Sequence, residues 1–141
     1  MKYLLPVFLV LFSAVTFTSC SKDDDDNPEK NEISIVGRWQ LDYEEITYDG
    51  ETKVSTEDPE TASIVNFYED GTVIIEMDSS DGRVNEEYTY KVSADGRYLS
   101  VMPDTEEDGP FSVEQLTDRL LVLSITYSTT EHIVSTFKRI D

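Results

Sequence analysis

The sequence predicts an all-β domain over residues 32–141, folded as an antiparallel up-and-down meander of about eight strands. In this range Ile and Val together occur 19 times and Ala twice; β-branched residues suit a pleated sheet, whereas Ala favours helices. Five of the six glycines directly follow an Asp, and Asp-Gly between alternating apolar runs is a strong hairpin signal. The last four of these pairs lie 11, 14 and 13 residues apart, which fits one strand plus one turn and leaves no room for crossover helices.

Alternation of apolar and polar residues locates the individual strands. Val84, Tyr88 and Tyr90, for example, fall on one face of a strand because they are separated by even numbers of residues. The expected strands cover residues 35–48, 62–68, 72–78, 84–92, 97–102, 110–116, 120–128 and 132–140. Residues 51–61 contain only Val54 as an apolar residue, so a long loop is expected there, with a short edge strand as the alternative.

Residues 1–19 are expected to be a lipoprotein signal peptide. Lys2 provides a positive start, and the apolar run from Tyr3 to Val15 is shorter than the ~20 residues of a membrane-spanning helix and typical of a signal-peptide core. Small residues precede Cys20, the single cysteine. This pattern resembles the lipobox of bacterial lipoproteins, which implies a lipid anchor on Cys20, palmitate included. The alternative is an ordinary signal peptide cleaved nearby.

Residues 20–31 are expected to form an acidic tether between the anchor and the domain. Lys22 is followed by four acids, Asp23, Asp24, Asp25 and Asp26. The run resembles the lipoprotein export signal of Bacteroidetes, which implies attachment to the outer membrane, facing the cell surface. The alternative is a tether alone, because polar, acidic segments that contain proline do not collapse.

The β domain opens with Gly37-Arg38-Trp39. Three further segments follow in order: a hairpin segment at 67–73, a late strand at 116–123, and the ending Phe137-Lys138-Arg139. This ordered set resembles the lipocalins, and more closely the lipocalin-like domains of Bacteroidetes lipoproteins. The resemblance covers residues 33–140 and implies a β-barrel, or an open half-barrel, that binds a small molecule. It also implies that Gly37 and Trp39 seal one end, with Lys138 or Arg139 across the indole as a cation–π contact.

Charge and composition exclude several functions. Acids outnumber bases 30 to 11, for a net charge of -19, so phosphate backbones are repelled and no nucleic-acid partner is expected. With one Cys and one His, one chain cannot build a Cys/His zinc site. Nucleophilic catalysis would depend on His132, which is more simply a strand-end histidine. We therefore expect no enzyme and no cofactor.

An acidic loop is a candidate metal site. The segment 104–109 resembles the start of a calcium loop, with Asp104, Glu106 and Asp108 before a glycine. The twelfth position should be Glu and is Gln115. An acidic hairpin loop without bound metal is therefore expected.

Two functions remain open. An eight-stranded barrel can be filled by side chains or can hold one small ligand, and close packing favours filling. A protein that binds a small apolar or amphipathic ligand would need a connected cavity. A structural or interaction protein, serving as accessory to an outer-membrane nutrient-uptake assembly, would have a filled barrel. The aromatic residues that could line a cavity are Tyr43, Phe67, Tyr88, Tyr90 and Tyr127. Glu86 shares a strand face with Val84, Tyr88 and Tyr90 and is expected near a strand end, with a polar anchor in the cavity as the alternative.

Overall fold

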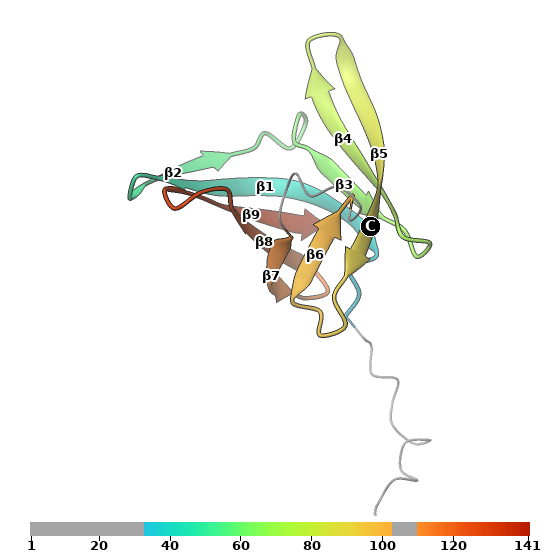
Figure 1. Cartoon of the computed structure of the whole chain (residues 1–141). Coiled ribbons are helices and arrows are strands. Elements are labelled where there is room, and N and C mark those ends of the chain that lie inside the picture. The colour runs from blue at the N-terminus through green and yellow to red at the C-terminus, as the bar shows by residue number, and fades with distance from the viewer. Residues whose placement is uncertain (1–32, 103–109) are drawn as a thin grey trace, which may run out of the picture. The chain divides into compact units, whose positions relative to one another are not determined.

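The computed structural model describes residues 33–102 and 110–141 (Figure 1). They form nine strands joined by turns and loops, with no helix among the described residues. The strands are β1 (Gly37–Tyr48), β2 (Glu51–Thr56), β3 (Ile64–Phe67), β4 (Thr72–Ser79), β5 (Gly82–Val92), β6 (Tyr98–Val101), β7 (Phe111–Leu116), β8 (Leu120–Thr126) and β9 (Glu131–Arg139). The unit Ile33–Asp141 contains all nine strands and the whole core cluster, so it has the core of its own that a domain requires.

The strands close into a barrel. Each strand from β3 to β9 pairs antiparallel with its neighbour in sequence, and β9 returns to pair with β1 over Trp39–Tyr48. The other edge of β1 is shared, because β3 pairs with Gly37–Gln40 and β2 with Tyr43–Tyr48. β2 and β3 thus occupy one position, and the barrel has eight positions around it. The predicted all-β meander is confirmed, and it is the closed form rather than the half-barrel.

The second strand is where the preferred sequence prediction, a long loop over residues 51–61, was wrong and the alternative, a short edge strand, is confirmed. The eight expected strands all form, with ends within two residues of the expected ones, but residues 51–56 are a strand and not a loop. Asp49 and Gly50 have φ values of 49° and 83°, the positive pair that a tight hairpin turn requires. Every residue of β2 is exposed. Backbone pairing to β1 and the 2.8 Å hydroxyl contact between Thr47 and Thr52 hold it, and neither leaves an apolar pattern in the sequence.

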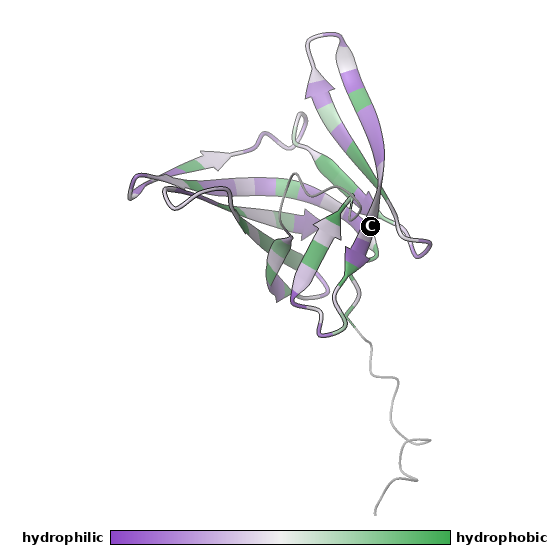
Figure 2. Ribbon diagram, in the orientation of Figure 1, coloured by the Kyte–Doolittle hydropathy of each residue, from purple (hydrophilic) through white to green (hydrophobic). Residues whose placement is uncertain are grey.

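The other Asp-Gly pairs also connect successive strands. Three of them join β3 to β4, β4 to β5, and β5 to β6, at Asp70-Gly71, Asp81-Gly82 and Asp95-Gly96, with Gly82 as the first residue of β5. The last pair, Asp108-Gly109, lies outside the described residues. Apolar and polar bands alternate along the strands between these turns (Figure 2), as expected of strands that face a core on one side.

The start of β1 is packed around Trp39, which has no exposed surface. Its indole Nε1 donates a 2.8 Å hydrogen bond to the carbonyl oxygen of Ile35, and the guanidinium of Arg139 lies 4.3 Å from the ring centroid. Arg139 also donates to backbone carbonyls at Val36 and Ser34. Lys138 instead pairs with Asp42 at 2.8 Å. Arg139 is therefore the cation that lies over the indole.

Glycine is required beside this cluster. Gly37 has a φ of 138°, which side-chain-bearing residues rarely adopt. A Cβ at this position would also collide with the Nη1 atom of Arg139. The Gly-x-Trp spacing thus places a residue without a side chain directly against the arginine that covers Trp39.

The hairpin of β4 and β5 extends away from the rest of the barrel (Figure 1). β6 pairs with β5 only over Tyr90–Val92, so most of β5 has β4 as its sole paired neighbour in the sheet. Arg83 holds the hairpin through ion pairs of 3.5 Å to Glu76 and 3.2 Å to Asp78. This divergence decides which aromatic residues reach the barrel interior.

Candidate functional site

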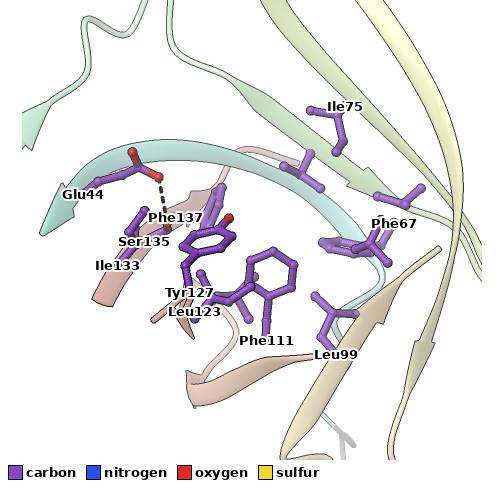
Figure 3. Close-up of a pocket in the computed structure, with 14 residues that line it drawn as sticks. Glu44, Phe67, Ile75, Leu99, Phe111, Leu123, Tyr127, Ile133, Ser135 and Phe137 are labelled. Carbon is purple, nitrogen blue, oxygen red and sulfur yellow. Dashed lines mark hydrogen bonds between the residues drawn. The ribbon is translucent and has the colours of Figure 1, made fainter. Parts of the chain in front are cut away.

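The barrel contains a cavity of about 270 Å³ (Figure 3). Its walls come from β1, β3, β4, β6, β7, β8 and β9, together with the residue that follows β8. The lining residues are Glu44, Val65, Phe67, Val73, Ile75, Leu99, Val101, Phe111, Leu123, Ile125, Tyr127, Ile133, Ser135 and Phe137. The barrel is therefore not filled by its own side chains, contrary to the expectation from close packing. The sequence indicates which residues face inward. It does not give the width of the barrel, which depends on how the strands pair and which decides whether space remains inside.

Three adjacent strands build one wall as a ladder of cross-strand rows. The strand register sets Leu41, Phe137 and Leu121 side by side in the deepest row. The next row is Glu44, Ser135 and Leu123, and above it lie Ile46, Ile133 and Ile125. One polar row is thus placed between two apolar rows.

A bulge in β1 brings the carboxylate of that polar row into the barrel. The register to β9 shifts between Leu41 and Tyr43, which adds one residue to β1 and exchanges the faces of everything after it. Strict alternation from Leu41 would point Tyr43 inward. With the extra residue Tyr43 pairs beside Thr136 on the outer face, and Glu44 faces the cavity beside Ser135.

Glu44 and Ser135 form the polar feature of the wall. The Ser135 hydroxyl donates a 2.7 Å hydrogen bond to Oε1 of Glu44 (Figure 3). Apart from the tyrosine at position 127, the other described lining residues are aliphatic side chains or phenylalanine. A polar group of a bound molecule would therefore meet this pair. Sequence reasoning missed both residues. It followed β1 without the bulge, which concealed Glu44, and it named no cavity residue on the last strand, which left out Ser135.

Two of the five aromatic residues expected in the cavity are there. Phe67 and Tyr127 line it (Figure 3); Phe67 is 2% exposed and Tyr127 53%, so one is deep and the other is at the mouth. Tyr43, Tyr88 and Tyr90 are not among the lining residues. The bulge turns Tyr43 outward, and the other two belong to β5, which diverges with its hairpin.

The two β5 tyrosines have local partners instead. Tyr90 packs edge-on against Phe67, with ring centroids 4.9 Å apart, and its hydroxyl donates to the carbonyl of Tyr68 at 2.7 Å. Burial, together with the nearby acidic side chains, raises the pKa of Tyr90. The Tyr88 hydroxyl donates to the carboxylate of Glu86, which raises the pKa of that tyrosine.

Two further residues singled out in the sequence, Glu86 and His132, lie on β5 and β9. Glu86 is exposed in the middle of β5, so the expectation of a strand end was wrong, and it does not line the cavity. His132 is the second residue of β9, as expected, with Nδ1 2.9 Å from the hydroxyl of Thr126.

The remaining expected sites fall largely outside the described residues. These are Cys20, the acidic run Asp23–Asp26 and the loop 104–109. Within the part of the chain that the structure describes, no group of three or more His, Cys, Asp or Glu is placed to hold a metal ion. No helix in that part is long and apolar enough to span a membrane.

No protein-family model and no curated protein sequence matches the chain. Several solved structures do. Bovine odorant-binding protein in complex with its natural ligand is 18% identical, with a TM-score of 0.48 over 80% of this chain and 76% of that one. The siderocalin Ex-FABP is 17% identical, with a TM-score of 0.45 over 74% and 73%. A de novo designed fluorescence-activating β-barrel is 13% identical, with a TM-score of 0.41 over 74% and 93%.

The first two of these proteins are lipocalins, the family that the Gly-x-Trp start resembles. Likeness at this level of identity and superposition assigns no family and no ligand. The closed strand pairing and the internal cavity of this chain define its class, a small antiparallel β-barrel with an apolar interior space.

Proposed function

We propose that the protein binds one small apolar or amphipathic molecule inside its barrel and acts without catalysis. The observation that carries this proposal is the cavity of about 270 Å³ with its mainly aliphatic and aromatic walls. Protein interiors keep few voids larger than a water molecule. At about 30 Å³ for each water-sized atom, the cavity takes a ligand of about nine non-hydrogen atoms. This is at the small end of ligand pockets, which usually span about 300–1,000 Å³.

The alternative function, a structural or interaction protein with a filled barrel, has less support. Its discriminating feature is a core without connected space, and the barrel interior has such a space. Three of the exposed apolar side chains, Val54, Val84 and Tyr98, are on three different strands, β2, β5 and β6. Scattered exposed apolar residues are normal on protein surfaces.

We further propose that the domain is carried at the outer face of the outer membrane by a lipid on Cys20. Support comes from the sequence: the apolar run of residues 3–15, the small residues before Cys20, and the acids Asp23–Asp26. An anchored barrel would hold its ligand at the cell surface. A partner protein in the same membrane would then receive or deliver that ligand.

Native mass spectrometry of the protein purified from its own host tests ligand binding. We expect a retained small molecule, or a mass increase with added 1-octanol. Ile125→Trp should abolish binding, because Ile125 faces the cavity and the larger ring occupies it. Thr126→Trp is the matched control, since the next residue along β8 is exposed and on the opposite face. The proposal fails if the native protein retains nothing and gains no octanol, or if both variants bind equally.

A further inference from the structure

We infer that the cavity selects an apolar molecule whose head group donates hydrogen bonds, above all a protonated amine. Glu44 is the residue that recognises this head group. This inference rests on the proposed function and adds the chemical class of the ligand. It starts from the polar row of the cavity wall, where a carboxylate and a hydroxyl are placed among aliphatic and aromatic side chains.

The polar pair offers acceptors. An ionised carboxylate accepts hydrogen bonds at both oxygens, with room for about four, and has no proton to donate. Ser135 uses its hydroxyl proton on Oε1 of Glu44 at 2.7 Å. What the pair presents to a ligand is therefore the rest of the acceptor capacity of Glu44 and the lone pairs of Ser135. An ammonium or hydroxyl head can use these acceptors, whereas a carboxylate head cannot.

Charge points the same way. None of the described residues that line the cavity is Lys or Arg, so the walls provide no counter-charge for an anionic ligand. Of the basic residues at the end of β9, Lys138 pairs with Asp42 and Arg139 lies over Trp39. An anionic head beside Glu44 would place two like charges together in surroundings that strengthen their repulsion. The net charge of -19 also concentrates cations near the protein.

The mouth of the cavity continues this chemistry. Beyond the isoleucine row, Tyr48 is the β1 partner of Glu131, and the amide of Tyr127 donates to the carbonyl of Glu131 at 3.1 Å. By strand alternation these three residues continue the face of Ile46, Ile133 and Ile125. Tyr48 and Tyr127 are 59% and 53% exposed. Aromatic faces beside a carboxylate attract cations, so a cationic head would be favoured on its way in.

Glu44 could instead serve only to tie β1 to β9 through Ser135. The two roles differ in one measurable respect. A carboxylate that only joins strands affects all ligands alike when it is neutralised. If the carboxylate recognises the head group, its neutralisation changes the relative affinities of ligands that differ mainly in their head groups.

The test is calorimetric titration of residues 21–141 with 1-octylamine, 1-octanol and octanoate at pH 7. All three are unbranched eight-carbon compounds. The amine and the alcohol have nine non-hydrogen atoms and octanoate, whose carboxyl carbon is the eighth carbon, has ten, so all three are close to the size of the site. The amine is protonated and the acid ionised at this pH. We expect affinity to fall from amine to alcohol to octanoate, with at least a tenfold difference between the amine and octanoate. A tenfold change in affinity corresponds to the free energy that a hydrogen bond to a charged group contributes.

Glu44→Gln and Glu45→Gln form the matched pair of variants. Both remove one negative charge from β1, but Glu45 pairs beside Val134 on the outer face. Glu44→Gln should reduce the preference for amine over octanoate at least fivefold, and Glu45→Gln should leave it unchanged. The inference is overturned if octanoate binds the native domain as tightly as the amine, or if both variants shift the preference equally. If none of the three compounds binds the native domain, the proposed function itself fails.

Discussion

Replacement of Trp39 by Ala should remove a large part of the stability of the domain. The side chain has no exposed surface, makes a 2.8 Å hydrogen bond to Ile35 and lies under the guanidinium of Arg139 at 4.3 Å. Truncation of a buried Trp costs about 3–5 kcal/mol, and small domains have about 5–15 kcal/mol in total. Urea unfolding of residues 21–141, followed by far-ultraviolet circular dichroism, measures the loss. Because Trp39 is the single Trp, its blue-shifted emission reports the same burial in the native domain.

Two further variants keep this prediction testable even if Trp39→Ala fails to fold. Trp39→Phe retains a ring for Arg139 and loses the N–H, which leaves the carbonyl of Ile35 without that donor and should cost about 1–3 kcal/mol. Tyr98→Ala is the control, because this aromatic side chain on β6 is 48% exposed; it should change stability by less than about 0.5 kcal/mol. A loss of less than ~1 kcal/mol for Trp39→Ala would refute the account of this cluster.

Three other predictions concern the anchor, the acidic run and a turn. Cys20→Ala should abolish labelling with palmitate and leave the melting temperature of the barrel unchanged; label that persists would contradict a lipid on Cys20. Replacement of Asp23–Asp26 by Ala should protect the protein from protease added to intact cells, whereas equal digestion of both forms would mean that the run is only a tether. The pKa of Asp70 is lowered by its hydrogen bonds with Thr72, first of all to the backbone N–H at 2.9 Å. This carboxylate therefore stabilises the fold above its ordinary pKa of 3.8 and loses that effect as the pH falls. The difference in melting temperature between native protein and Asp70→Ala should thus be larger at pH 6 than at pH 2, and an equal difference would contradict the assignment.

Most strands could be predicted because the meander is local. Each strand from β3 to β9 pairs with its neighbour in sequence, so alternation and the Asp-Gly turns carry nearly all the information needed. β2 is the exception, since it has no buried residue to produce a pattern. Closure of the barrel was harder to predict from the sequence, because it pairs Trp39 on β1 with Arg139 on β9, at opposite ends of the domain sequence. The aromatic-basic ending suggested their contact through the family resemblance, and nothing in the spacing did.

The cavity wall depended on a feature that alternation cannot represent. A β-bulge adds a residue and reverses the faces of the strand after it, so Tyr43 and Glu44 exchange places in β1. The sequence did contain a signal. Leu41 and Ile46 are five residues apart, and two apolar residues at an odd spacing can share a face only if the register shifts between them. The cavity volume had no comparable signal, because it depends on the width of the closed barrel.

Nuclear magnetic resonance of the domain with bound 1-octanol tests the central claim most directly. Nuclear Overhauser effects between the alkyl chain and the protein show where the ligand lies. We predict contacts to the methyl groups of Val73, Leu99 and Leu123, which line the cavity and are at most 7% exposed. Contacts confined to exposed methyl groups such as those of Val84 and Val92, which are 44% and 41% exposed, would contradict a ligand site inside the barrel.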